Sequence, residues 1–174
     1  RFPPLFLFLF LNSNSARSMQ YRNLGHTGLR VSVVSLGSWL TYGRSVDNSV
    51  AAACIRTAID GGINLIDTAD IYHKGESELA LGEILSDYTR SDLVLATKVF
   101  FPMSDNPNDR GLSRKHIRES IDKSLHRLRV DYVDLYQCHR HDDGTPILEV
   151  VQTMSDLIRE GKILYWGVSC WTAA

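Results

Sequence analysis

The fold of this 174-residue chain is set by one stretch of sequence, Gly61-Gly62-Ile63-Asn64-Leu65-Ile66-Asp67-Thr68-Ala69-Asp70-Ile71-Tyr72. Two glycines at its start are typical of a helix end. The run from Ile63 to Asp67 is apolar apart from its second and last residues and has the length of a buried strand. Polar residues follow that run at once. The stretch therefore predicts a strand whose carboxyl end opens into a loop rich in groups that could carry chemistry.

Short apolar runs alternate with helical patterns on both sides of this stretch, which is typical of a parallel sheet with crossover helices. Upstream we expect a hairpin of Tyr21 to Leu24 and Leu29 to Val33, a strand from Val34 to Gly37, and a helix from Asn48 to Asp60 with Asp47 as its N-cap. Downstream we expect strands from Leu93 to Lys98, from Tyr132 to His139 and from Ile163 to Ser169.

Three further helices are predicted between these strands. Ser77 could cap the first, which would turn Leu81, Ile84 and Leu85 inward. Ser113 precedes the second, whose apolar stripe holds Ile117, Ile121, Ser124, Leu125 and Leu128. Thr145-Pro146 would open the third as N-cap and first helical residue, with Leu148, Val151, Met154 and Ile158 inside and Gly161 at its end.

Alternating strands and helices fit either a doubly wound sheet or a (β/α)8 barrel, and periodicity alone does not separate the two. The polar strand ends favour the barrel. Asp67, Lys98 and His139 each occupy the last position of a predicted strand, so their side chains would converge at one mouth, where barrels build active sites. A G-x-G-x-x-G loop is also missing after the first strand. We predict an α/β (β/α)8 TIM barrel, truncated after about five β/α units, with an N-terminal β-hairpin.

The composition argues against several classes of function. The chain has 19 Lys and Arg against 20 Asp and Glu, for a net charge of −1, without the basic excess of a nucleic-acid-binding protein. Its cysteines, Cys54, Cys138 and Cys170, are odd in number and lack zinc-ligand spacing. We therefore expect a cytoplasmic protein with no metal, no nucleic-acid partner and no membrane partner.

Residues 1–18 do not resemble part of the fold. Phe2 to Leu11 is almost wholly Phe, Leu and Pro, and it is too short to span a bilayer, for which roughly 20 residues are needed. It could be the core of a weak signal peptide, but the cytosolic character of the remainder favours a spurious extension with Met19 as the natural start. We expect the folded domain to comprise residues 19–174.

The quoted stretch resembles the signature G-x-N-x-x-D-T-A-x-x-Y of the aldo-keto reductases. The similarity extends from Met19 to Thr172 and includes Gly37-Ser38-Trp39, Thr97-Lys98, the strand ending in His139, and Gly167-Val168-Ser169. Within that family, Tyr21-Arg22-Asn23-Leu24-Gly25 and Arg110-Gly111-Leu112-Ser113-Arg114 most resemble potassium-channel β subunits and their bacterial relatives. The resemblance implies the N-terminal part of an NADP-dependent oxidoreductase that reduces aldehydes or ketones.

The resemblance also implies a catalytic tetrad, which falls on Asp67, Tyr72, Lys98 and His139. Hydride transfer to a carbonyl carbon builds negative charge on the oxygen, which then needs a proton donor within hydrogen-bond reach. Tyr72 would be that acid. Lys98 would stabilise its phenolate, Asp67 would orient Lys98, and His139 would position the carbonyl oxygen. Taken singly, each residue could be a cap, a solvated charge or a packing residue.

The cofactor implied is NADP(H). By the same resemblance, its nicotinamide end would contact Gly37, Ser38, Trp39, Asp67, Ser169 and Cys170, and the substrate pocket would be lined by Trp39, Tyr72 and His139. Trp39 could instead cover the core, and Ser169 could cap a helix. Cys170 replaces the asparagine usual in the family, and His73-Lys74-Gly75 follows Tyr72 where many members have glycine directly. The family holds the cofactor phosphates mainly on loops after later barrel strands, so NADP rather than NAD rests on the resemblance.

Two other functions fit parts of the sequence. A regulatory subunit could use this barrel to bind an ion channel, but channel β subunits carry asparagine at the position of His139, which favours a reductase. His139 and His141 form an H-x-H pair of the kind that ligates metal in some barrel hydrolases. His141 falls on a polar loop without clear partner ligands, so a solvated loop is the better interpretation.

Overall fold

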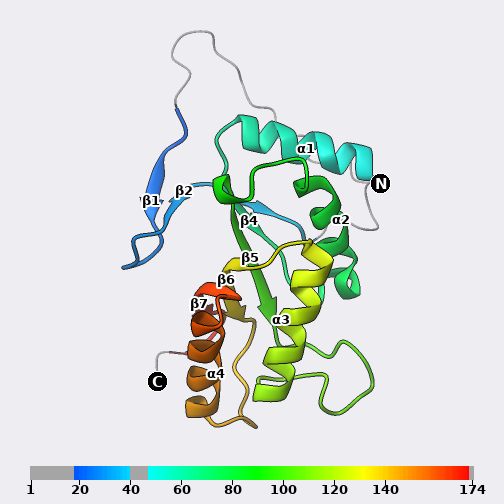
Figure 1. Ribbon diagram of the computed structural model, residues 1–174, viewed down its shortest axis with the longest axis vertical. Coiled ribbons are helices and arrows are strands. Elements are labelled where there is room, and N and C mark those ends of the chain that lie inside the picture. Colours follow the sequence, from blue (N-terminus) through cyan, green and yellow to red (C-terminus); the bar gives the residue numbers. More distant parts are fainter. Residues whose placement is uncertain (1–17, 40–46, 173–174) are drawn as a thin grey trace.

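The computed structural model describes residues 18–39 and 47–172, and it contains two sheets (Figure 1). The first is an antiparallel hairpin of β1 (Tyr21–Asn23) and β2 (Arg30–Ser32). The second is a parallel sheet of five strands. Its strands are β3 (Leu36–Gly37), β4 (Leu65–Asp67), β5 (Val94–Val99), β6 (Val133–Cys138) and β7 (Ile163–Val168). The expected hairpin and strands are therefore present, with ends that differ from the predicted ones by up to two residues.

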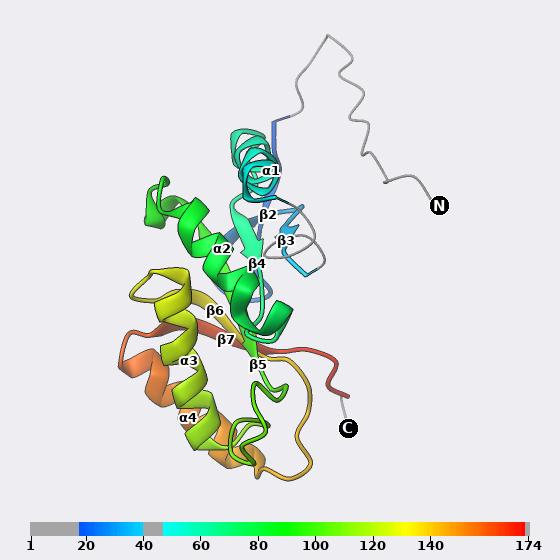
Figure 2. The same ribbon diagram turned by 90° about the vertical axis from the view of Figure 1, so that its right-hand side faces the viewer.

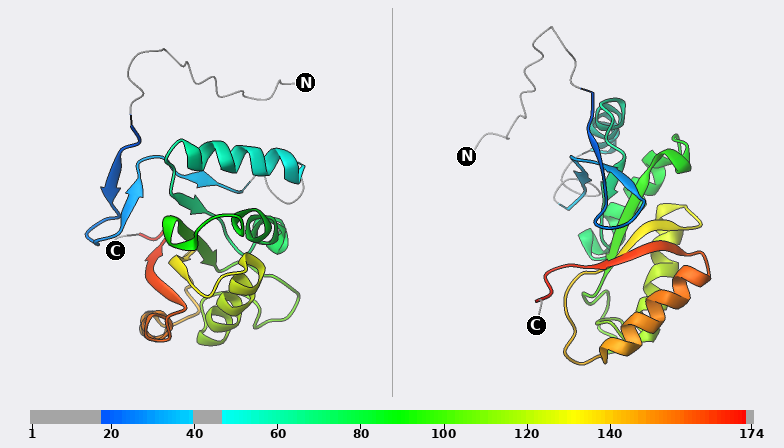
Figure 3. Two further views of the ribbon diagram at one scale, coloured as in Figure 1. Left: turned by 45° about the horizontal axis from the view of Figure 1, so that its top comes forward. Right: turned by 90° about the vertical axis from the view of Figure 1, so that its left-hand side faces the viewer.

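The order of the strands separates the two folds that the sequence left open. The parallel sheet runs β3-β4-β5-β6-β7 in chain order, so it has no point at which the strand order reverses, as a doubly wound sheet has. The four main helices lie along one face of the sheet (Figure 2). They follow one another around the outside of the curved sheet, as the left view of Figure 3 shows. This is the arrangement of consecutive β/α units in a (β/α)8 barrel, as predicted.

The helices on that face are α1 (Asn48–Asp60), α2 (Glu76–Leu85), α3 (Arg114–Leu128) and α4 (Ile147–Arg159), with 3-10 turns at η1 (Tyr72–Gly75) and η2 (Arg90–Asp92). The start of α3 follows the prediction, because the Ser113 hydroxyl accepts a hydrogen bond from the backbone N–H of His116. Asp47 is the N-cap of α1 but makes no side-chain capping bond.

Two predicted helix starts are wrong. Ser77 lies inside α2, whose N-cap is Gly75 in the left-handed region at φ 95°, a conformation that glycine adopts without strain. Pro146, and not Thr145, is the N-cap of α4. The Thr145 hydroxyl instead donates a hydrogen bond to the Asp142 carboxylate at 2.8 Å, which holds Thr145 in the preceding loop.

The predicted inner face of α4 is also wrong in part. Met154 is buried as expected, but Leu148, Val151 and Ile158 are 62, 37 and 41% exposed. The buried face consists of Val150, Thr153, Met154 and Leu157. Thr153 can be buried because its hydroxyl donates to the Glu149 carbonyl within the helix at 2.7 Å. The apolar residues of α4 are spread over a wide arc of the helix surface, and only part of that arc packs against the sheet.

The hairpin is attached to the amino end of β4. Asn64 makes this connection: its Oδ1 accepts from Ser32 N at 2.8 Å, and its Nδ2 donates to the Arg30 carbonyl at 3.1 Å. The Tyr21 hydroxyl adds a bond to the Gly62 carbonyl at 2.7 Å. The signature asparagine therefore has a structural role at the end of the strand opposite Asp67.

The core lies between the sheet and the helices. Its fully buried side chains include Ile55 of α1, Leu81 of α2, Ile121 of α3 and Leu157 of α4. Helices α2 and α3 approach most closely at Gly82, where an added Cβ would lie 2.3 Å from the Arg127 carbonyl oxygen. The small residue is needed there because the backbones touch. No helix within residues 18–39 and 47–172 is long and apolar enough to cross a membrane.

Candidate active site

The candidate site residues lie at the carboxyl end of the parallel sheet. Asp67 is the last residue of β4, Lys98 is next to last in β5, and His139 directly follows β6. The parallel registers align these ends: Asp67 pairs with Ala96, and Lys98 pairs with Gln137. Tyr72 begins η1 at the end of the loop after β4, which is held to β5 by bonds from Thr68 N to the Ala96 carbonyl and from Asp70 N to the Lys98 carbonyl.

The Lys98 ammonium connects three groups. Its Nζ donates to Asp67 Oδ2 at 2.6 Å and to the Thr68 carbonyl at 2.8 Å, and it lies 3.4 Å from the Tyr72 hydroxyl. Lys98 is only 7% exposed, so its charge is poorly screened by water. The paired Asp67 carboxylate makes this burial possible. A positive charge thus lies beside the phenol oxygen that would release a proton.

His139 lies beside Asp67, Tyr72 and Lys98 and contacts Tyr72 through its ring. Its ring meets the Tyr72 ring edge to face, with centroids 5.9 Å apart. Burial, together with the positive charges of Lys98 and Arg140, lowers the pKa of His139 to about 4. The ring is therefore neutral at neutral pH and can donate one hydrogen bond. Its Nδ1 is buried without a hydrogen-bond partner among the described residues.

The residues after β3 lie beside this set. The Ser38 backbone N–H donates to the Asp67 carbonyl at 3.0 Å, and the Ser38 hydroxyl donates to Thr68 Oγ1 at 2.8 Å. Gly37 pairs with Asp67 in the sheet register. Trp39 is 64% exposed, and its ring centroid lies 6.4 Å from that of Tyr72. With most of its surface exposed, Trp39 does not cover the core.

The predicted residues after β7 are placed less directly. The Ser169 backbone N–H donates to the Cys138 carbonyl, which fixes Ser169 beside the end of β6. The Ser169 hydroxyl lies 3.7 Å from the sulfur of Cys170, an exposed residue in the left-handed region at φ 56°. These two residues belong to the same sheet end as His139, but they make no hydrogen bond to Asp67, Tyr72 or Lys98.

Sequence analysis missed two neighbours of His139. The ring of Phe101 meets that of His139 edge to face at 4.9 Å. The Arg140 guanidinium lies over the Phe101 ring, 5.5 Å from its centroid. The signal available was position alone, because each residue lies within three positions of a candidate site residue, Phe101 after Lys98 and Arg140 after His139.

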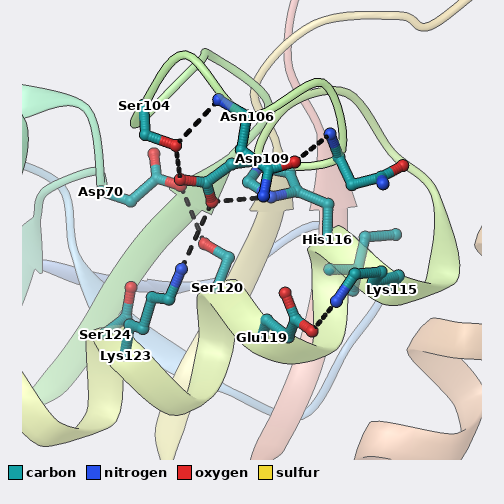
Figure 4. Close-up of polar contacts among 12 residues, drawn as sticks. Asp70, Ser104, Asn106, Asp109, Lys115, His116, Glu119, Ser120, Lys123 and Ser124 are labelled. Atoms are coloured by element: carbon teal, nitrogen blue, oxygen red, sulfur yellow. Dashed lines mark hydrogen bonds and ion pairs between the residues drawn. The ribbon is translucent and has the colours of Figure 1, made fainter.

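The loop of residues 100–113, which carries Phe101, is held on α3 (Figure 4). Asp109 is its anchor: its carboxylate accepts from the Ser104 hydroxyl at 2.7 Å and from Lys123 at 3.3 Å. The buried ring of His116 lies 3.5 Å from the same carboxylate. The Ser104 hydrogen bond and Lys123 lower the pKa of Asp109, so this anchor stays ionised at neutral pH.

A buried polar network lies behind the sheet, between β5 and helices α2 and α3. Glu78 is fully buried; its carboxylate accepts from Thr97 Oγ1 at 2.6 Å and from Arg127 Nε at 2.7 Å. Asp70 is equally buried and accepts from the Ser120 hydroxyl at 2.8 Å (Figure 4). The network holds the backbone beside the site in place, because Thr97 precedes Lys98 and Asp70 lies two residues before Tyr72.

Asp70 is expected to make stability depend on pH. Burial and the nearby Glu78 carboxylate raise the pKa of Asp70 to about 7 from an ordinary value of 3.8. Between the unfolded pKa of 3.8 and the folded pKa of about 7, the folded state binds more protons than the unfolded state. Protonated Asp70 therefore adds to the free energy of unfolding below pH 3.8, and this stabilisation is lost as the pH rises to 7. The free energy of unfolding of wild type relative to Asp70→Asn should therefore fall from pH 4 to pH 7. Urea denaturation of both proteins across this range tests it, and a constant difference would contradict it.

The H-x-H pair forms no metal centre with its neighbours. His141 Nδ1 lies 3.1 Å from Asp143, and its ring meets that of Trp171 at 4.9 Å, whereas the His139 ring faces Tyr72. Among the residues that the structure describes, no group of three His, Cys, Asp or Glu side chains could hold a metal ion.

Comparison with known proteins agrees with the fold. A family model described as the aldo/keto reductase family matches residues 33–174. The chain belongs to this family. It is 46% identical over 157 residues to a probable voltage-gated potassium channel subunit beta of Oryza sativa subsp. japonica, and 45% identical over 157 residues to its counterpart from Arabidopsis thaliana. Each alignment covers 89% of this chain and 48% of the relative, so the chain spans about half the length of the curated relatives it matches.

A solved structure shows the same likeness. The aldo-keto reductase AKR11C1 from Bacillus halodurans, in its holo form, matches with a TM-score of 0.77 and 35% sequence identity. The match covers 87% of this chain and 50% of that one. The five parallel strands and the four helices between them therefore correspond to part of an aldo-keto reductase barrel.

Proposed function

We propose that this chain carries the catalytic residues of an oxidoreductase that reduces aldehydes or ketones to alcohols with NADPH, with Tyr72 as general acid. One observation carries the proposal: the buried Lys98 ammonium lies between Asp67, at 2.6 Å, and the Tyr72 hydroxyl, at 3.4 Å. A surface lysine would not be held in this way. The arrangement suits a phenol that must lose a proton to a developing alkoxide.

The reaction balances with these residues. When bound, the reduced nicotinamide supplies the hydride that the carbonyl carbon accepts with its electron pair. The carbonyl oxygen accepts the proton of the Tyr72 hydroxyl, and Lys98 stabilises the phenolate left behind. Neutral His139 donates a hydrogen bond to the same oxygen. Tyr72 regains its proton from solvent before the next turnover.

The residues present fit a nicotinamide at this end of the sheet. The proposed contacts are Gly37 at the end of β3, Ser38 and Trp39 after it, Asp67 at the end of β4, and Ser169 and Cys170 after β7. Among the described residues the hydroxyl of the half-buried Ser169 contacts only the Cys170 sulfur, at 3.7 Å, so it can still take a carboxamide as partner. The choice of NADP(H) over NAD(H) rests on the resemblance.

The experiment is a spectrophotometric assay of a full-length protein that contains this chain, with NADPH and a panel of aliphatic and aromatic aldehydes. We expect NADPH oxidation that depends on aldehyde and slows when NADH replaces NADPH. Binding of NADPH with no oxidation by any aldehyde or ketone of the panel would contradict the proposal.

That negative result would favour a second candidate, a cofactor-binding regulatory subunit of a potassium channel. The observation behind it is that the Oryza and Arabidopsis relatives are both described as channel subunits. The presence of His139 next to Tyr72 supports the reductase, because the resemblance places asparagine there in channel subunits. Co-purification of the protein with a membrane channel would support the second candidate.

A further inference from the structure

One cation at the rim of the candidate active site has no carboxylate partner among the residues that the structure describes. Arg140 follows His139 at the end of β6, and its Nη1 donates to the His139 carbonyl at 2.7 Å. Its guanidinium lies over the Phe101 ring, 5.5 Å from the centroid. Within the part of the chain that the structure describes, Arg140 makes no ion pair. The three arginines of α3 differ, since Arg114, Arg118 and Arg127 each pair with an acidic residue of another helix or of its C-terminal end.

Two ring contacts connect this cation to the proposed acid. Phe101, which lies under the guanidinium, meets His139 at 4.9 Å, and His139 meets Tyr72 at 5.9 Å. Arg140 is also close enough to His139 for its charge to contribute to the lowered pKa of that ring. A substrate whose carbonyl oxygen met Tyr72 and His139 would therefore extend over Phe101 toward the guanidinium.

The acidic side chains that follow Arg140 are engaged elsewhere. The Asp142 carboxylate accepts bonds from Leu112 N at 2.7 Å and Gly144 N at 3.0 Å. Asp143 is fully exposed and pairs with His141. At the centre of the site, Asp67 balances Lys98. Neither carboxylate pairs with Arg140, so its guanidinium is available to an anion from outside the described chain.

We propose that Arg140 binds a carboxylate of the substrate, so that the preferred substrates are aldehydes that carry a negatively charged carboxylate group. The planar guanidinium suits this ligand because it can donate two parallel hydrogen bonds to the two carboxylate oxygens. The Phe101 ring, with its face toward the guanidinium, holds it in place and provides an apolar surface for the body of the substrate. This inference rests on the proposed reductase function and specifies its substrate class.

The test compares two aldehydes that differ in charge at one end, 4-carboxybenzaldehyde and its neutral methyl ester, methyl 4-formylbenzoate. With a full-length protein that contains this chain, kcat/KM should be higher for the carboxylate. Arg140→Gln should lower kcat/KM for the carboxylate by about 10- to 100-fold, the range expected when a hydrogen bond to a charged group is lost. The value for the ester should change by no more than about 2-fold, which also shows that the variant folds.

The matched control is Arg56→Gln on the exposed side of α1, which removes the same charge from a helix that carries no site residue. Its effect on both aldehydes should be negligible. An equal loss for both aldehydes in Arg140→Gln, or a raised KM for NADPH, would overturn the inference and leave the reductase function standing. Reduction of neither aldehyde by wild type would overturn the reductase function and this inference with it.

Discussion

The Tyr72→Phe variant is expected to lose turnover by about 100- to 10,000-fold, the range attributed to a positioned general acid. The substitution removes only the hydroxyl, which lies 3.4 Å from the Lys98 ammonium. The ring can keep its contacts with His139 and Trp39, so the site should keep its shape. Affinity for NADPH, measured by fluorescence titration, should therefore stay within about 2-fold of wild type, because the acid acts in the transition state.

Tyr88→Phe is the matched control, since Tyr88 packs against the core outside the site. It should leave turnover close to wild type. If Tyr72→Phe kept more than about a tenth of wild-type turnover, Tyr72 would not be the acid. A comparable loss in both variants would point to a general fault of folding.

Arg127→Met is expected to lower the free energy of unfolding by about 3–5 kcal/mol, because it leaves a buried carboxylate without its cation. Arg127 pairs with Glu78 at 2.7 Å, and the Glu78 side chain is fully buried. Methionine would preserve much of the volume and the helix propensity, so the loss would reflect the charge. The measurement is urea denaturation of a full-length protein that contains this chain.

Two further variants separate charge from packing. Adding Glu78→Gln to Arg127→Met removes the stranded charge but keeps an acceptor for the Thr97 hydroxyl, so the double variant should recover at least half of the lost stability. Arg129→Met breaks the Arg129–Glu83 pair, in which both side chains are more than half exposed, and should cost less than about 1 kcal/mol. If Arg127→Met and Arg129→Met lowered the free energy of unfolding equally, the buried pair would contribute no more to stability than the exposed pair.

Local sequence was sufficient for the order of the elements. The alternation of apolar runs and helical stripes predicted every main strand and helix, and α1 has the predicted ends, Asn48–Asp60. Ser113 marked the start of α3 because a serine cap acts within three residues of its own position. Where local signals competed, the prediction was wrong. Thr145 could cap α4 or bond Asp142, and only the folded loop shows that it does the latter.

The sequence by itself determined the order of strands and helices and which polar groups end the strands, because the alternation of apolar runs and helical patterns is written along the chain. It placed Asp67, Lys98 and His139 at strand ends, and the resemblance added Tyr72. Only the tertiary structure decided which partners these groups have. It shows the exposed Leu148 and Ile158 on α4, Glu78 paired with Arg127 behind the sheet, and Arg140 over the Phe101 ring. The reason is that the exposure and pairing of a side chain depend on elements tens of residues away in the sequence. The local sequence pattern does not show which of these elements pack against it.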